Sequence, residues 1–276
     1  MLIDTHAHLY WDSYKDDFNE VIQRALDSGI TTIINVGVDI EKSQVAAELN
    51  SEKIKFYSTI GIHPHEAIKY VSDVSLPAGR HGIQQDIEKL EEIYQSHTVK
   101  VVAVGECGLD YKEVDNQTKD LQRKLFQAQI DLAKKLNLPL IVHCRDDRSE
   151  NPENSECWDE VLEMTKDHFG IYHCYSGLLP TTNYVLQTTN LLVSFAATIT
   201  YPKNGYLREA VKILPLEKIV LETDCPFLPP QSKRGQRNEP ANVLEIAQLI
   251  ADLKGISLEK VANQTTNNVT KILKLS

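Results

Sequence analysis

Short runs of β-branched and other apolar residues alternate with longer amphipathic segments along the whole chain. The clearest helical pattern covers 117–136, where leucines and an alanine recur at steps of three and four. Two further helices are predicted over 240–254, which has Pro240 in its first turn, and over 258–273. The runs predicted to be strands are Met1–Thr5, Thr32–Val36, Lys55–Thr59, Val99–Val104, Pro139–Val142, Gly170–Tyr172, Leu191–Ser194 and Lys218–Leu221.

Strands that alternate with helices predict parallel pairing, so the candidates are an open doubly wound sheet and a closed (β/α)8 barrel. An open dinucleotide-binding sheet requires a glycine-rich turn after its first strand, and His6-Ala7-His8-Leu9 stands there instead. Eight predicted strands in 276 residues, with no Gly/Ser/Pro-rich linker between them, favour the TIM barrel. We therefore expect a single TIM-barrel domain over 1–276, with extra helices at its C-terminal end.

The segments 66–84 and 146–156 are longer than ordinary connections and are expected to be surface excursions.

Composition and charge argue against several classes of protein. The chain has 29 Lys and Arg against 39 Asp and Glu, a formal net charge of −10, which argues against a protein that coats nucleic acid through a basic surface. No stretch approaches the ~20 consecutive apolar residues of a membrane span, and the N-terminus lacks the basic and apolar regions of a signal peptide. Five cysteines without a CxxC pair are typical of reduced thiols. We expect a cytoplasmic protein without a membrane partner, in which any polyanion is held locally by a metal or a short basic loop.

Imidazoles or carboxylates follow six of the eight predicted strands. In a barrel these strand ends converge on one face. The residues expected to meet there are His6, His8, Glu106, His143, His173 and Asp224. Crowded carboxylates repel one another and lose hydration, whereas one or two divalent cations neutralise them and accept imidazole lone pairs. The sequence therefore predicts a divalent metal site.

Four cysteines each directly follow one of the expected ligands. Strand alternation turns the residue after an inward ligand outward, toward the helices, where a small thiol packs well. We interpret them as packing residues and not as metal ligands: Cys107, Cys144, Cys174 and Cys225.

Seven separated motifs stand in order along the chain: Asp4-x-His6-x-His8, Gly61-Ile62-His63-Pro64-His65, Gly105-Glu106-Cys107-Gly108-Leu109-Asp110, His143-Cys144-Arg145, His173-Cys174-Tyr175-Ser176-Gly177, Glu222-Thr223-Asp224-Cys225-Pro226 and Arg237-Asn238-Glu239-Pro240. At these motifs the sequence resembles the TatD-type metal-dependent deoxyribonucleases of the amidohydrolase superfamily. The resemblance covers essentially the whole chain and implies a distorted TIM barrel, a divalent metal site and hydrolysis of DNA phosphodiester bonds, typically from the 3′ end. By position, it makes His6, His8, Glu106 and Asp224 the ligands of one metal and Glu106, His143 and His173 the ligands of a second, with Glu106 as the bridge.

Individual side chains of these motifs have expected roles. Asp224 is expected to be both a ligand and the general base that accepts a proton from the attacking water, and Glu106 is expected to be essential as the bridging carboxylate. His63 follows the third predicted strand and is expected to donate a hydrogen bond to a substrate phosphate. Arg237, in the basic segment 231–240, and Arg145 are the other predicted substrate contacts.

Three functions are compatible with this site. The leading hypothesis is a monomeric 3′–5′ exodeoxyribonuclease that acts on single-stranded DNA ends with Mg, Mn or Zn. The alternative is a hydrolase of a small amide, ester or phosphoester, favoured by the net charge of −10 and by the lack of an aromatic and basic strip for stacking bases. A non-catalytic metal- or nucleic-acid-binding protein is disfavoured because the set of ligands is complete.

Overall fold

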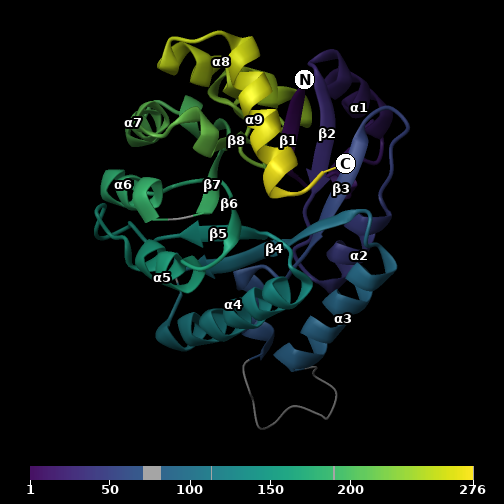
Figure 1. Cartoon of the computed structure of the whole chain (residues 1–276), viewed down its shortest axis with the longest axis vertical. Helices are drawn as coiled ribbons and strands as arrows, with labels where there is room; N and C mark the ends of the chain where they lie inside the picture. The colour runs from purple at the N-terminus through teal and green to yellow at the C-terminus, as the bar shows by residue number, and fades with distance from the viewer. Residues whose placement is uncertain (71–81, 113, 189, 276) are drawn as a thin grey trace.

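The computed structural model describes residues 1–70, 82–112, 114–188 and 190–275 and shows a barrel of parallel strands surrounded by helices (Figure 1). The strands pair in chain order from the first to the eighth, and an isolated parallel bridge between Ala7 and Cys225 joins the two ends of the sheet. The predicted TIM barrel is confirmed. Its strands are β1 (Leu2–Ala7), β2 (Ile30–Asn35), β3 (Lys55–Ile60), β4 (Val101–Asp110), β5 (Leu140–Arg145), β6 (Phe169–Tyr172), β7 (Asn190–Phe195) and β8 (Ile219–Leu221).

The helices connect these strands and follow the last of them. The α-helices are α1 (Phe18–Asp27), α2 (Ile40–Glu48), α3 (Ile83–Ser96), α4 (Asn116–Leu136), α5 (Glu156–Thr165), α6 (Leu179–Thr188), α7 (Gly205–Ile213), α8 (Val243–Lys254) and α9 (Leu258–Ile272). The 3-10 helices are η1 (Asp12–Tyr14), η2 (Pro64–Tyr70), η3 (Ala197–Thr200), η4 (Leu216–Lys218), η5 (Gln231–Lys233) and η6 (Pro240–Asn242). The predicted helix over 117–136 is α4, the one over 240–254 is η6 followed by α8, and the one over 258–273 is α9.

Strand β4 is longer than the sequence predicted, because the expected strand ended at Val104 whereas β4 continues to Asp110. Two glycines make the extension possible. Gly105 and Gly108 have φ values of 149° and 142°, and a Cβ at Gly108 would lie 2.0 Å from the carbonyl oxygen of His143. Gly108 pairs with His143 in the sheet. The close approach of β4 to β5 places Glu106 beside His143.

The two predicted excursions differ in how much of them the structure describes. Residues 71–81 of the segment 66–84 lie outside the described residues, and the remainder belongs to η2 and to the start of α3. The segment 146–156 connects β5 to α5. Arg148 supports this connection, because its guanidinium donates to the carbonyl oxygens of Asn154 and Ser176.

The barrel interior is an apolar layer to which every strand contributes a side chain. These side chains are Ile3, Ile34, Tyr57, Val102, Ile141, Ile171, Leu192 and Val220. Val269 and Leu273, in and just after α9, join the same layer. The Asn268 amide of α9 donates to the carbonyl oxygens of Leu216 and Ile219, at the start of β8. Helix α9 therefore covers the end of the barrel opposite the carboxyl ends of the strands.

A second, larger apolar layer lies between the strands and the surrounding helices. It contains Cys107, Cys144 and Cys225, in the outward position that the sequence predicted for them. All five cysteines are free thiols, and the Sγ atoms of Cys144 and Cys157 are 3.5 Å apart.

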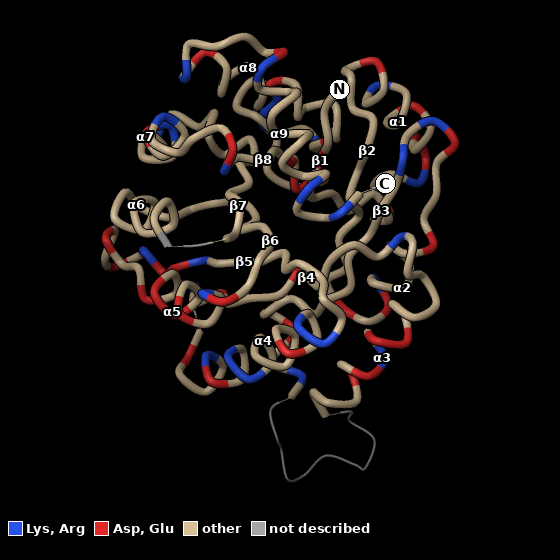
Figure 2. The backbone as a smooth tube through the Cα atoms, in the orientation of Figure 1, with Lys and Arg blue, Asp and Glu red and all other residues tan. Residues whose placement is uncertain are grey.

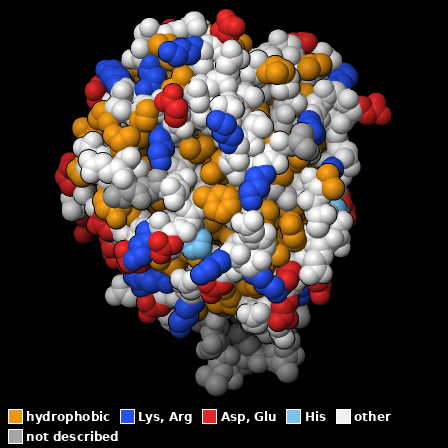
Figure 3. Space-filling view, viewed as in Figure 1, with side chains coloured by type: hydrophobic (Ala, Val, Ile, Leu, Met, Phe, Trp, Pro, Cys, Tyr) orange, Lys and Arg blue, Asp and Glu red, His pale blue; other side chains and the backbone are white. Residues whose placement is uncertain are grey.

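Charged residues lie mainly along the outer helices, whereas the strands are largely uncharged (Figure 2). On the face shown in Figure 3, basic and acidic side chains are interspersed. Among the described residues, none of the helices combines the length and apolar character that a bilayer crossing requires.

Replacing Leu273 by alanine is expected to lower the free energy of unfolding by about 2–5 kcal/mol, because the side chain is buried in the layer that closes the barrel. Urea unfolding followed by circular dichroism measures this change. Leu26→Ala at the end of α1 is the matched control, since that leucine is 37% exposed, and it is expected to change stability by less than about 1 kcal/mol. Equal losses in the two variants would contradict the role given to the α9 contact.

Candidate metal centre

The structure brings together the residues that the sequence placed at the strand ends. His6 lies in β1 and His8 just after it, Glu106 in β4, and His143 in β5. His173 and Asp224 follow β6 and β8. Among the described residues, side-chain atoms suited to bind a metal lie within 4.8 Å of one another in three overlapping groups: His6, His173 and Asp224; His6, His8 and Glu106; and His63, Glu106 and His143.

The first part of the cluster surrounds a point between His6, His8, Glu106 and Asp224. The Nε2 atom of His6 lies 3.2 Å from His8 Nε2 and 3.3 Å from Glu106 Oε2. Asp224 Oδ1 lies 3.4 Å from His8 Nε2. Ligand atoms about 2.1 Å from a common cation are separated by roughly 3.0–3.4 Å in octahedral or tetrahedral geometry. These separations therefore fit a shared divalent cation.

The other oxygen of Glu106 faces a second set of imidazoles. Glu106 Oε1 lies 2.9 Å from His143 Nδ1, 3.3 Å from His173 Nε2 and 3.5 Å from His63 Nε2. Burial alone would raise the pKa of this carboxyl, but His173, His63 and His6 outweigh it and hold the pKa well below its ordinary range. One ionised carboxylate thus presents each of its oxygens to a different group of nitrogen donors.

Polar contacts of the Nδ1 atom fix the orientation of the His8 ring. Its Nδ1 atom lies 2.9 Å from the hydroxyl of Tyr10 and 3.0 Å from the carbonyl oxygen of Val36. The Tyr10 hydroxyl donates to the same carbonyl at 2.7 Å. A donor bond from Nδ1 leaves the lone pair on Nε2, the atom that faces Asp224.

The orientation of His173 depends on Glu222. The Nδ1 atom of His173 lies 2.9 Å from Glu222 Oε1, which also accepts a hydrogen bond from the backbone N–H of Cys174. Burial would lower the pKa of His173, but Glu222 and Glu106 raise it well above its ordinary value. Glu222 is itself fully buried. This arrangement directs Nε2 of His173 toward Glu106.

Asp224 is positioned by closure of the barrel. Its backbone N–H donates to the carbonyl oxygen of His6, and its φ of 57° lies in the left-handed region, which aspartate tolerates better than most residues. The neighbouring Thr223 donates from both its N–H and its hydroxyl to Asp4. Asp4 also accepts from the backbone N–H of His6, and its complete burial raises its pKa to about 8. Asp4 therefore connects the two segments that carry His6 and Asp224.

A further carboxylate, that of Asp110, lies at the rim of the cluster. Its Oδ2 atom is 2.9 Å from His65 Nε2 and 3.1 Å from His143 Nε2. Burial would lower the pKa of His143, but its hydrogen bonds to Asp110 and Glu106 raise the pKa to about 9. The two carboxylates thus favour the protonated ring of His143, and binding of a metal to this ring would require loss of that proton.

The predicted substrate contacts occupy three different environments. His63 lies among the metal-binding groups, so its nitrogen is available to a cation as well as to a phosphate. Arg145 is at the rim, with its side chain 49% exposed and Nη1 4.0 Å from Asp110. Arg237 instead binds Asp17 through both Nη atoms and stacks over the ring of Tyr14. The structure does not bring Arg237 into the metal cluster, and its contact with phosphate stays a prediction.

Three residues that contact the expected ligands were not predicted to belong to the site: Glu222, Asp4 and Tyr10. A signal was present in each case, because each of them lies two positions from an expected ligand. Of these, only Asp4 shares a strand with its ligand, whereas Tyr10 and Glu222 lie in the turns after β1 and β8, where strand alternation does not apply. A carboxylate or hydroxyl at that distance from a ligand is a candidate partner for its ring or backbone.

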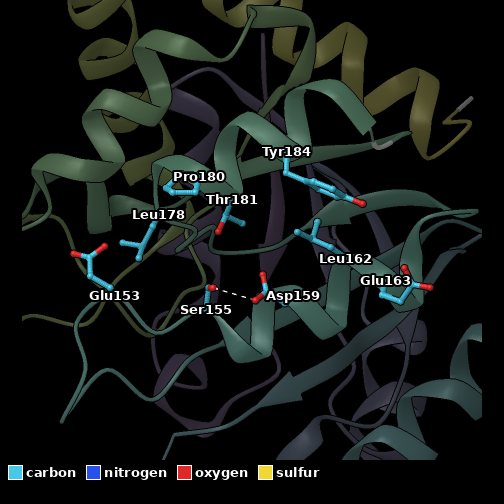
Figure 4. Close-up of a pocket in the computed structure, with 9 residues that line it drawn as sticks. All are labelled: Glu153, Ser155, Asp159, Leu162, Glu163, Leu178, Pro180, Thr181 and Tyr184. Carbon is cyan, nitrogen blue, oxygen red and sulfur yellow. Dashed lines mark hydrogen bonds between the residues drawn. The ribbon is translucent and has the colours of Figure 1, made fainter.

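A separate cavity of 420 Å³ lies between α5 and α6 (Figure 4). It is lined by Leu162, Leu178 and Tyr184 together with three carboxylates, those of Glu153, Asp159 and Glu163. It contains none of the imidazoles of the metal cluster and is not part of the site described above.

Comparison with known proteins decides the family. A family model described as TatD related DNase matches residues 3–274. The chain belongs to the TatD-related DNase family. In this family, it is 35% identical to the uncharacterized metal-dependent hydrolase YabD of Bacillus subtilis, over 100% of both chains. It is 30% identical to the 3′–5′ ssDNA/RNA exonuclease TatD of Pantoea ananatis, over 99% of this chain and 100% of that one.

Solved structures agree with this assignment. YJJV, a TatD homolog from Escherichia coli K12, has a TM-score of 0.82 and 26% sequence identity, covering 100% of this chain and 98% of that one. The family resemblance predicted from the motifs is confirmed. This TatD-family chain is a metal-dependent hydrolase, and its residues are able to hold a metal.

Glu222→Gln in this TatD-family chain is expected to weaken divalent metal binding about 10- to 100-fold, because His173 loses the charged partner that orients it. Titration of metal-stripped protein with Mn²⁺ by isothermal calorimetry measures the change. Glu163→Gln is the matched control, since its side chain is 69% exposed and pairs with Lys166. Unchanged affinity in Glu222→Gln would contradict the orienting role.

Proposed function

We propose that the chain is an exonuclease that removes nucleotides from the 3′ end of single-stranded DNA. The observation that carries the proposal is the Glu106 carboxylate, whose two oxygens face two groups of imidazoles. Two divalent cations held on either side of this carboxylate would suit a phosphodiester, because they would stabilise the attacking and the leaving oxygen. The named activity of the Pantoea ananatis relative supports the polarity and the single-stranded substrate.

The residues of the site are proposed to have two roles, metal binding and proton transfer. Bound divalent cations would polarise the phosphate and acidify water. Burial would raise the pKa of Asp224, but its hydrogen bond with His8 and the nearby His173 and His6 lower it, so the carboxylate is ionised at neutral pH. Its side chain is 14% exposed, more than that of any neighbour in the first group. Asp224 is therefore proposed as the general base that takes the proton of the attacking water.

His63 and Arg145 are proposed to contact the substrate phosphate from the rim of the cluster. Burial lowers the pKa of His63 to about 3, so at neutral pH its ring is uncharged and offers one N–H donor. Arg145 supplies a permanent positive charge. The expected cytoplasmic location and monomeric state stay predictions; light scattering after size-exclusion chromatography measures the latter.

One alternative keeps the same site but changes the substrate. A hydrolase of a small phosphoester, ester or amide is favoured by two observations. The net charge is −10, and the Arg237 guanidinium, which was predicted to bind phosphate, is already paired with Asp17.

A time course with single-stranded DNA labelled at its 5′ end separates the two functions. The protein is stripped of metal and resupplied with Mg²⁺ or Mn²⁺, and an RNA of the same sequence and a chromogenic phosphodiester are tested in parallel. A ladder that shortens from the 3′ end is expected, and none without added metal. Intact DNA and RNA together with rapid hydrolysis of the small ester would overturn the nuclease assignment in favour of the alternative.

A further inference from the structure

Three aromatic side chains from opposite ends of the sequence meet beside the metal cluster. Tyr10 and Trp11 follow β1, and Phe227 follows β8. The ring of Trp11 stacks on that of Tyr10 at a centroid distance of 6.0 Å and meets the edge of Phe227 at 6.2 Å. Phe227 in turn lies 6.1 Å from the ring of His8. We refer to Tyr10, Trp11 and Phe227 as the aromatic platform.

Two of the three rings are open to solvent, although the platform adjoins a buried site and Tyr10 is only partly exposed. Trp11 is 36% exposed and Phe227 is 49% exposed, whereas His8 is 3% exposed. Trp11 and Phe227 are two of the few large hydrophobic residues that are exposed in the described part of the chain. Their position at the edge of the metal cluster indicates a ligand that reaches the cluster and covers the rings at the same time.

Hydrogen bonds hold the two loops of the platform together. Arg237 binds Asp17 at 2.7 Å and also donates to the carbonyl oxygen of Ser13, both in the segment that follows Trp11. The amide of Asn238 donates to the carbonyl oxygen of Phe227. Arg237 and Asn238 are consecutive, so one short stretch of chain fixes both loops before any ligand arrives.

We propose that the aromatic platform stacks against the bases of a single-stranded nucleic acid whose terminal phosphodiester lies at the metal cluster. This inference rests on the proposed nuclease function and adds to it the residues that recognise the bases. Each base has a flat π face, so stacking on tyrosine, tryptophan and phenylalanine binds a strand without reading its sequence. Arg237 is then a positioning residue that holds the loop of Trp11 in place.

Stacking also accounts for how an acidic protein holds a polyanion. The formal net charge is −10, and two cationic side chains near the platform are already paired, Arg237 with Asp17 and Lys15 with Asp12. Stacking energy depends much less on net charge than phosphate contacts do. The affinity for the strand is therefore expected to depend weakly on salt and strongly on the presence of bases.

Tryptophan fluorescence tests the contact without requiring turnover. The sequence has two tryptophans, and Trp158 is fully buried, so the exposed Trp11 reports on ligands. Metal-loaded protein is titrated with a thymidine oligonucleotide that carries slowly hydrolysed phosphorothioate linkages at its 3′ end. Saturable quenching is expected with this oligonucleotide and not with an abasic strand of equal length. Tyr184→Ala, which removes another exposed aromatic ring on α6, is expected to show the same quenching as the wild type.

Kinetics with the double variant Trp11→Ala/Phe227→Ala test the consequence for catalysis. Its kcat/KM for a base-bearing oligonucleotide is expected to fall about 10- to 100-fold, mainly through KM, as loss of stacking predicts. The wild-type preference for base-bearing over abasic ends is expected to disappear in this variant. Trp11→Phe is expected to retain most of the wild-type kcat/KM because it keeps an aromatic ring.

The outcomes separate the platform from the nuclease function. If DNA is degraded, but the double variant keeps the wild-type kcat/KM and no quenching is seen, the platform is refuted and the nuclease function stands. Quenching of Trp11 without hydrolysis of DNA or RNA under either metal supports the platform as a base-binding surface and overturns the nuclease function. Absence of both quenching and hydrolysis overturns both.

Discussion

Replacing Glu106 by glutamine is expected to reduce metal-dependent hydrolysis by at least about 100-fold, more than the loss of a partner that only orients a ligand. The change keeps the shape of the side chain but removes its charge and one ligand oxygen. Both groups of nitrogen donors face this carboxylate, so neither group would keep a complete set of ligands for a cation. Initial rates on labelled oligonucleotide over a range of Mn²⁺ concentrations measure the effect.

Circular dichroism and thermal unfolding show whether the Glu106→Gln variant is folded. Glu163→Gln on the surface of α5 makes the same chemical change away from the site and is expected to keep the wild-type rate. The thermal stabilisation that Mn²⁺ gives the wild-type protein is expected to be lost in Glu106→Gln, because binding to the folded state is what raises the unfolding temperature. A wild-type rate in Glu106→Gln at saturating Mn²⁺ would contradict the shared-carboxylate site.

Asp224→Asn is expected to lower kcat by roughly 100- to 10,000-fold, the usual contribution of general acid–base catalysis. Asparagine retains an oxygen at the position 3.4 Å from His8 Nε2, but it cannot accept the proton of the attacking water. A metal titration of the activity separates the two roles of Asp224. If Asp224 is the base, kcat stays low at saturating Mn²⁺, whereas a residue that only binds metal is rescued by high metal concentration.

Asp252→Asn is a suitable control for this substitution, because Asp252 is exposed on α8 and accepts a hydrogen bond from Gln248. It is expected to leave kcat unchanged. Complete recovery of Asp224→Asn by added metal would remove the proton-transfer role and leave Asp224 as a ligand alone.

Much of the fold could be predicted because local pattern and topology agree. The eight apolar runs are short and separated by amphipathic helices, so each strand was found within a few residues of its observed bounds. The exception was β4, which continues through Asp110. The extension requires glycine at positions 105 and 108, because a side chain at either position would collide with the backbone of β5. A single sequence does not show that β5 lies this close.

The position of the site was predictable for a related reason. Once the barrel is assumed, His6 and Asp224 must meet although they are far apart in sequence, because the carboxyl ends of the strands share one face. The side chains that orient these ligands were harder to find. Glu222 and Tyr10 act through rings in the site, and their contacts depend on side-chain directions that the strand pattern does not specify.

Two side-chain contacts near the site join residues too far apart in the sequence to be predicted from it. Arg237 lies in a locally basic segment, but Asp17, from the beginning of the chain, pairs with it. The sequence shows no aromatic strip, yet closure of the barrel between Ala7 and Cys225 brings Trp11 and Phe227 into contact. Both features are made by contacts between the two ends of the chain.

The number of divalent cations bound per chain tests the central claim most directly. Metal-stripped protein is equilibrated with Mn²⁺, dialysed against a defined free concentration and analysed by atomic emission, with Glu106→Gln treated in parallel. The shared Glu106 carboxylate predicts two cations per wild-type chain and a loss of both sites in the variant at the same free Mn²⁺ concentration. An unchanged number of cations in Glu106→Gln would show that Glu106 does not bridge them.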